Sequence, residues 1–237
     1  GRVVSVFWNL TSSETNEKIQ ALEREVVPEY AVHHGIISSN PALFARIKAV
    51  VDGGENLKGE EKQLLDETYQ SFVRAGAELT DTDRERVNAI SEELAGLTTE
   101  FGQNVLKDTN EFELVLEAGE DTAGLPDFVL EMGKAEAEAR DKSGKYVFST
   151  SRSSITPFLQ YAEKRDRREQ IYKAYTECGT RGTDNHPIIQ RVVSLRSERA
   201  KLLGFQSHAD FMLDDRMAKT PEAVTNLLDQ VWAPCQK

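Results

Sequence analysis

One row of apolar residues at helical spacing constrains the fold of this 237-residue chain more than any other feature. Thr80-x-x-Asp83 resembles a capping box, and the row follows it: Val87, Ile90, Leu94, Leu97, Phe101 and Val105. Cap and row together cover about seven turns at about 3.6 residues each. A helix of this length must be packed along much of its length or form a wall of something larger.

Helix start signals occur on both sides of this segment. Thr11-Ser12-Ser13-Glu14 offers a capping box for a helix that contains Ile19 and Tyr30, with a bend or break expected at Pro28. Asn40-Pro41 has the form of an N-cap followed by the first helical residue. Further helices are expected near Glu60 to Ala77, from Asp127 to Ser143-Gly144, from Thr156-Pro157, around Asp166 to Tyr175, and from Pro187 to Leu203.

Two short segments alternate in the manner of strands. In residues 111–117, Phe112, Leu114 and Leu116 share one face, and in residues 145–150, Tyr146 and Phe148 do so. A helix between them permits a small parallel or mixed sheet. We therefore predict a mainly α fold, a multi-helix bundle with a two-stranded β element at about 111–117 and 145–150, with residues 1–237 forming a single, mostly helical part.

Charge and cysteine content limit the partners. The formal net charge of -11 argues against nucleic acid, and the one basic run, Lys164 to Arg168, is interpreted as a solvated helix face opposite acidic neighbours. No apolar run approaches the roughly 20 residues that span a bilayer, so no membrane partner is expected. Two cysteines without a C-x-x-C pattern suit a reducing, cytoplasmic setting.

The segment from Ser207 to Asp215 holds one histidine and three aspartates, His208, Asp210, Asp214 and Asp215, which raises the question of a metal site. On a helix His208 and Asp210 point about 200° apart, and Asp210 with Asp214 alone would make a weak site. Ser207 is a good N-cap whose partner is Asp210, after a helix stop at Gly204. Thr220-Pro221-Glu222 repeats the start signal. We interpret these residues as helix caps.

Other candidate groups are weaker. His33-His34 has no nameable proton partner, Cys178 lacks a histidine partner, and Gly179-x-x-Gly182 matches no phosphate loop. H-E-x-x-H is absent from the sequence. The sequence therefore predicts no catalytic, cofactor-binding or metal-binding residue in this chain.

Five long segments carry a family resemblance: LRSERAKLLGFQSHADFMLDDRMAKTPEAV, LAGLTTEFGQNVLKDTNEFELVL, AGLPDFV, NPALFARIKAV and SITPFLQYAEKRDRREQIYKAY. They resemble the M3 (thimet oligopeptidase) family of zinc metallopeptidases, and the bacterial peptidyl-dipeptidase, or dipeptidyl carboxypeptidase, branch is the nearest match. The resemblance implies a mostly α-helical protein of two halves around a deep channel. It also implies a zinc ion held by H-E-x-x-H and a later glutamate, and release of dipeptides from the C-termini of short peptides.

No position here matches a catalytic residue of that family. By resemblance the chain covers part of the N-terminal half, so we expect a non-catalytic portion of the channel wall, without its own zinc, that excludes large folded substrates. Its partners would be the missing catalytic half and, in the full-length protein, short peptides. The alternative is a free-standing helical module that binds peptides or proteins without catalysis, and an independent metalloenzyme built on His208 is remote.

Overall fold

The computed structural model describes residues 2–53 and 57–236 of the chain, which form two compact units. Unit 1 contains residues 2–99 and 189–236, and unit 2 contains residues 100–188. Helices α5 and α9 each supply residues to both units. The predicted mainly α fold with a small two-stranded sheet is confirmed.

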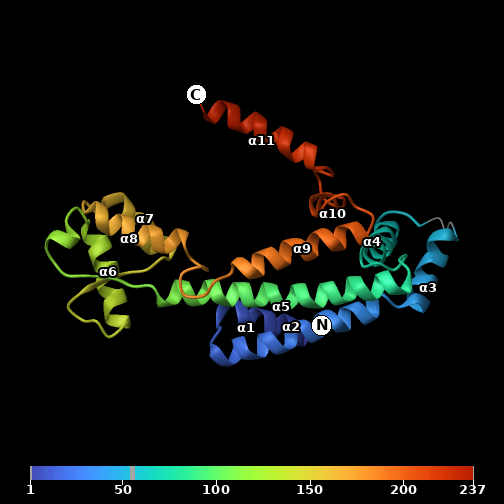
Figure 1. The fold of residues 1–237 in the computed structure, drawn as a ribbon, viewed down its shortest axis with the longest axis horizontal. Coiled ribbons are helices and arrows are strands. Elements are labelled where there is room, and N and C mark those ends of the chain that lie inside the picture. Colours follow the sequence, from blue (N-terminus) through green and yellow to red (C-terminus); the bar gives the residue numbers. More distant parts are fainter. Residues whose placement is uncertain (1, 54–56, 237) are drawn as a thin grey trace. The chain divides into compact units, whose positions relative to one another are not determined.

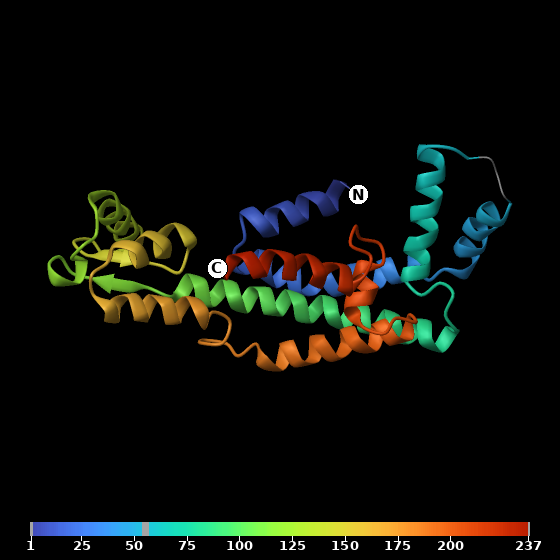
Figure 2. The same ribbon diagram turned by 90° about the horizontal axis from the view of Figure 1, so that it is seen from above.

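In the described part of unit 1, all regular elements are helices. Its elements are α1 (Arg2–Ser13), α2 (Glu17–Ser38), α3 (Pro41–Asp52), α4 (Glu60–Arg74), most of α5 (Asp81–Glu111) and of α9 (His186–Leu202), α10 (His208–Leu213) and α11 (Pro221–Cys235). Figure 1 shows α9 running beside α5. Helices α3 and α4, seen from above in Figure 2, meet through the stacked rings of Phe44 and Phe72.

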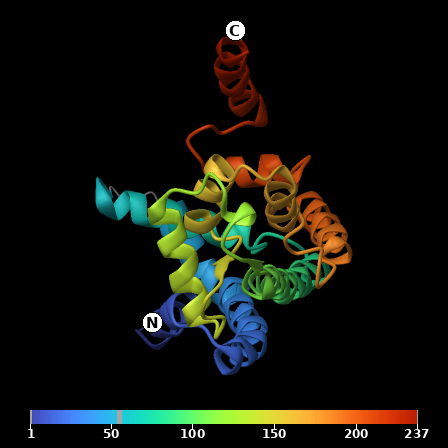
Figure 3. The ribbon, with the colours of Figure 1, turned by 90° about the vertical axis from the view of Figure 1, so that its left-hand side faces the viewer.

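The long helix α5 organises this unit. The predicted cap at Thr80 is present, because the Asp83 amide donates to Thr80 Oγ1 at 3.2 Å. The Asp83 carboxylate accepts from the Thr80 hydroxyl, at 2.8 Å, and not from the Thr80 backbone amide as in a full capping box. Ile90 and Leu94 are buried against Leu195 of α9. Viewed nearly along its axis, α5 has α2 and α9 on different sides (Figure 3). The predicted apolar row is therefore a packing surface from Val87 to Leu97, whereas Phe101 further along is exposed.

Unit 2 is built around a two-stranded sheet. Its elements are β1 (Leu114–Leu116), a 3-10 turn η1 (Glu120–Thr122), α6 (Asp127–Ala139), β2 (Tyr146–Phe148), α7 (Arg152–Tyr161) and α8 (Arg165–Thr176), together with the end of α5. The strands pair antiparallel, with Leu114 opposite Phe148 and Leu116 opposite Tyr146. The expectation of a parallel or mixed sheet is therefore wrong for these two strands.

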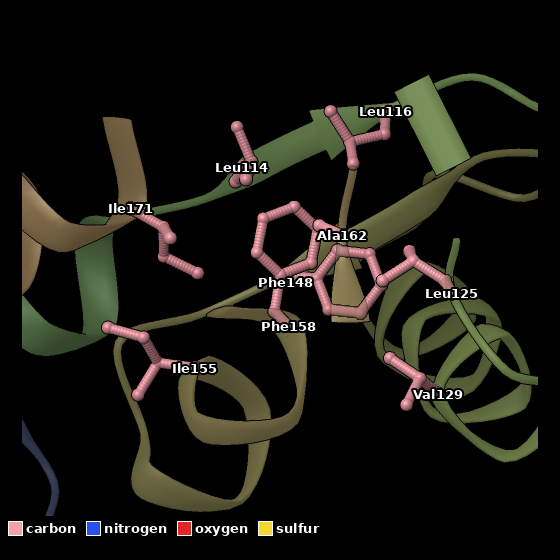
Figure 4. Packing of buried hydrophobic residues seen from close by; sticks show 9 residues of the cluster. All are labelled: Leu114, Leu116, Leu125, Val129, Phe148, Ile155, Phe158, Ala162 and Ile171. Carbon is pink, nitrogen blue, oxygen red and sulfur yellow. The ribbon is translucent and has the colours of Figure 1, made fainter. Parts of the chain in front are cut away.

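The core of unit 2 lies between the sheet and its helices (Figure 4). The rings of Phe148 and Phe158, 4.7 Å apart, fill its centre and are fully buried. Helix α6 approaches the Phe148 ring closely, since a Cβ at Gly133 would lie 2.7 Å from Phe148 Cζ. The buried members of this core are Leu114, Leu116, Leu125, Val129, Phe148, Ile155, Phe158, Ala162 and Ile171.

The first predicted capping box is wrong. Residues 11–13 are the last turn of α1, and the N-cap of α2 is Asn16, whose side chain accepts from the amides of Lys18 and Ile19. The hydroxyls of Thr11 and Ser13 donate instead to carbonyls of their own helix, at Trp8 and Asn9. In the last turn of a helix, a Ser or Thr hydroxyl can donate to a carbonyl of the preceding turn, and it is then not available to cap the next helix.

Other helix boundaries shift without changing the architecture. Of the bend or break expected at Pro28, the break is wrong, because α2 continues through this residue. Helix α7 begins at Arg152, before Thr156-Pro157, and α6 ends at Ala139, before Ser143-Gly144. The Asn40 cap is confirmed, since its Oδ1 accepts from the Leu43 amide at 3.0 Å.

Candidate functional site

Two of the residues that suggested a metal site, His208 and Asp210, lie in the first turn of α10, whereas Asp214 is the C-cap of this helix and Asp215 follows it. The Asp210 amide donates to Ser207 Oγ at 3.2 Å, and the Ser207 hydroxyl donates to Asp210 Oδ2 at 2.7 Å. Gly204 has the left-handed φ of 84° expected after a helix stop, and Thr220 caps α11 by accepting from the Ala223 amide. The interpretation of Ser207, Asp210 and Thr220 as cap residues is confirmed.

Asp214 and Asp215 bind an arginine of another helix. Arg74, near the end of α4, donates from Nη1 to Asp214 at 3.2 Å and lies 3.4 Å from Asp215 through Nε. Its Nη2 donates to the carbonyl of Phe211 at 2.8 Å. The guanidinium also lies 4.3 Å from the centre of the Phe211 ring. These contacts attach α10 and the segment after it to α4.

His208 does not join these carboxylates. Its Nδ1 is buried and has no hydrogen-bond partner among the described residues. Burial, and then the nearby Arg196 and Arg199, hold the pKa of His208 below its usual value, so the imidazole is neutral at pH 7. Within residues 2–53 and 57–236, no three His, Cys, Asp or Glu side chains lie together as a metal site would require. The described residues therefore do not fit the zinc ion that the resemblance implies for the full-length parent.

The remaining predicted candidates lie apart from one another. His33 and His34 are exposed on α2, where the His34 ring packs edge-on to Tyr30. Cys178 lies against α5, with Sγ 3.2 Å from Thr109 Oγ1. The basic run faces acidic groups as predicted, because Lys164 and Arg167 both bind Asp121. Hydrogen bonds from Arg167 and then Lys164 lower the pKa of Asp121.

Sequence reasoning missed a buried carboxylate in unit 2. Asp108 of α5 is only 1% exposed and accepts backbone hydrogen bonds from Gly179 (2.8 Å), Arg181 (3.2 Å) and Gly182 (3.1 Å). Glycine is needed at the last of these, because a Cβ there would lie 2.6 Å from Asp108 Oδ1. The spacing Gly179-x-x-Gly182 was the sequence feature that could have indicated this loop. The loop binds the carboxylate of Asp108 through its backbone amides, and not a phosphate.

Sequence reasoning also missed a cavity in unit 1. It has a volume of about 780 Å³ and lies among helices α2, α4, α5, α9 and α10. Arg74, Arg199 and Phe211 line it together with the polar side chains of Gln63 and Asn88. These residues come from distant parts of the sequence, so no local pattern indicates the cavity. Its volume falls within the range of about 300–1,000 Å³ that is usual for small-molecule sites.

No helix of the described ranges is both long enough and apolar enough to cross a membrane.

The profile of Peptidase family M3 matches residues 158–235. The chain is similar to that family along residues 158–235, and the resemblance is confirmed. Over 97% of its length it is 33% identical to dipeptidyl carboxypeptidase of Escherichia coli (strain K12), of which it covers 34%. It is also similar to probable cytosolic oligopeptidase A of Arabidopsis thaliana (28% identical, 98% of this chain, 35% of the relative) and to oligopeptidase A of Salmonella typhimurium (26%, 96% and 35%). The chain spans about a third of the length of the curated relatives it matches.

Proposed function

We propose that residues 1–237 form a non-catalytic part of the substrate-channel wall in a longer zinc metallopeptidase, one that releases dipeptides from the C-termini of short peptides. The observation that carries this proposal is the similarity to dipeptidyl carboxypeptidase along 97% of the chain, against 34% of the relative. In this proposal the zinc ligands and the group that activates water lie in the remainder of the longer protein. No catalytic step is assigned to a residue of this chain.

An apolar face on α11 supports the proposal. Leu227, Leu228, Val231 and Trp232 follow helical spacing, and each side chain is more than half exposed. An exposed apolar row of this kind is unusual on a complete soluble domain and is typical of a surface that packs against more protein. In the proposed protein this face packs against the catalytic half.

The test is to express the gene that encodes this chain together with all of its flanking coding sequence. We expect an H-E-x-x-H motif downstream and zinc-dependent release of dipeptides from peptides with a free C-terminus. Peptides with an amidated C-terminus should be cleaved far more slowly, because a peptidyl-dipeptidase must recognise the terminal carboxylate. A gene without the motif, or a product that cleaves neither peptide, would contradict the proposal.

The second candidate is a free-standing helical module that binds peptides without cleaving them. The cavity of unit 1 favours it, since its volume of about 780 Å³ would hold a short peptide segment. A reading frame that stops soon after Lys237, a folded monomer, and a peptide dissociation constant below millimolar would favour this candidate over the first.

We also propose that the protein acts in the cytosol. Cys178 and Cys235 are both free, as in proteins of reducing compartments, and one relative is described as cytosolic. Cell fractionation with an antibody against the chain tests this, and recovery from a membrane or extracellular fraction would contradict it.

A further inference from the structure

Arg199 of α9 is a cation without an acidic partner. Its guanidinium lines the cavity of unit 1 and lies 5.4 Å from the centre of the Phe211 ring. Its Nε is buried and has no hydrogen-bond partner among the described residues. The neighbouring carboxylate of Glu198 pairs with Arg86 and not with Arg199. The other guanidinium on the same ring, that of Arg74, is bound to two aspartates.

The partial burial of the Arg199 charge is electrostatically unfavourable. Burial, and then the charges of Arg196 and Arg74, lower the pKa of Arg199. Arginine nevertheless stays protonated in proteins, so the positive charge persists at neutral pH. A partly buried cation with a free Nε is costly unless an anion and a hydrogen-bond acceptor reach it.

The acidic groups around the cavity are bound to other partners. Asp215 pairs with Arg74 and with Arg216, the latter at 3.3 Å. Glu67 accepts a hydrogen bond from Gln63 at 2.8 Å, and Glu198, the neighbour of Arg199 in sequence, pairs with Arg86. No acidic group of the described cavity wall is paired with Arg199, which leaves its guanidinium available to an anion from solution.

We propose that the cavity of unit 1 binds a small solute with a carboxylate or phosphate group, and that the oxyanion of this solute pairs with the guanidinium of Arg199. Guanidinium groups bind carboxylate and phosphate through short, charge-assisted hydrogen bonds. Phe211, whose ring Arg74 and Arg199 both approach, adds an apolar part to the cavity wall, and Gln63 and Asn88 offer amides to a polar part of the solute. This site is independent of peptide cleavage.

The test is calorimetric titration of the 237-residue chain with inorganic phosphate and, separately, with N-acetylglycine as a carboxylate. Sodium chloride at the same ionic strength controls for general screening. We expect one of the two oxyanions to bind at a single site, and the tighter one identifies the group that the site prefers. Arg199→Met should weaken this binding by about tenfold or more, as expected for loss of a charge-assisted hydrogen bond.

Arg196→Met is the matched control, because Arg196 is exposed, lies one turn earlier on α9 and does not line the cavity. It should change the affinity by less than about twofold, as is usual for an exposed charge at a distance. Ser91→Asp places a carboxylate at the cavity wall and should weaken oxyanion binding while Arg199 is retained. Ser91→Asp also provides the test if Arg199→Met fails to fold. Wild-type protein that binds neither oxyanion, or variants that all bind equally, would overturn the proposal.

Discussion

Arg86 of α5 and Glu198 of α9 form a two-pronged ion pair, with Nε 2.6 Å from Oε1 and Nη2 2.8 Å from Oε2. Two turns further along α5, Glu93 makes the reciprocal pair with Arg191, at 2.5 and 2.8 Å. The order of the charges is reversed between the two pairs. This pattern fits only an antiparallel packing of α9 on α5 in the observed register.

Exchange of charges in the first pair tests this register. Arg86→Glu places two carboxylates together, so the melting temperature should fall by a few degrees, and Arg86→Glu with Glu198→Arg should recover most of the loss. The effect of the single variant should shrink at about 1 M salt, where the screening length falls to about 3 Å. Melting curves at both salt concentrations provide the measurement. Failure of the double variant to recover stability would contradict the packing of α9 on α5.

Acid should weaken the same contact. The hydrogen bond from Arg86 lowers the pKa of Glu198, and that from Arg191 lowers the pKa of Glu93. Their stabilising effect is therefore complete above the unfolded glutamate pKa of about 4.3 and is lost as the pH falls through the lower folded values. We expect melting temperatures to fall below about pH 4.3, and Glu93→Gln with Glu198→Gln should flatten this part of the profile. An unchanged profile in the double variant would exclude these two carboxylates as its source.

Gly133→Ala should destabilise unit 2 although alanine favours helices. The added Cβ would lie 2.7 Å from Cζ of Phe148, whose ring is fully buried and packed on Phe158. Overpacking of this kind costs about 1–3 kcal/mol of unfolding free energy, measured by urea denaturation. Gly102→Ala is the control, because a Cβ there meets no atom within 4 Å, so it should be neutral or stabilising. Equal effects of the two changes would contradict the packing of α6 on β2.

Asp108→Ala should loosen the loop that follows α8. It removes the acceptor of three backbone amides, of Gly179, Arg181 and Gly182, and it leaves these donors without their partner. We expect a loss of about 3 kcal/mol or more in unfolding free energy, together with faster proteolysis within residues 178–185. Glu111→Ala, one turn further along α5 at an exposed position, should leave both measurements nearly unchanged. Proteolysis at an unchanged rate in Asp108→Ala would show that the carboxylate does not hold this loop.

The exposed apolar face of α11 should promote hydrophobic association of the 237-residue chain. We expect it to bind a hydrophobic dye or to self-associate, and Leu228→Glu with Trp232→Glu should reduce both effects. Asp229→Lys, a charge change on the same helix, is the control. Dye fluorescence and light scattering provide the measurement, and no change in the double variant would exclude this face as the cause.

Local signals predicted the helices well where a cap and an apolar row coincide. Thr80 and Ser207 both bond the amide three residues later, which depends on sequence alone. Helix α1 escaped prediction because β-branched residues such as Val3 and Val6 give a weak helical signal, and the hydroxyl of Thr11 bonds within its own helix.

The cavity could not be predicted, because its shape depends on packing between distant helices. Arg74 and Phe211 are far apart in sequence, and only the tertiary fold brings the arginine onto the aromatic ring. The environment of Arg199 could not be predicted either. In the sequence it is a basic residue in the last turn of a helix, and only the structure shows that its Nε is buried without a hydrogen-bond partner among the described residues.

The most direct test of the proposed function is a peptidase assay of the purified 237-residue chain with added zinc and short peptides that have free C-termini. We predict no release of dipeptides above the rate without protein, while the full-length product of the gene, assayed in parallel, cleaves the same peptides. Zinc-dependent turnover by the 237-residue chain itself would contradict the proposal that these residues form a non-catalytic channel wall.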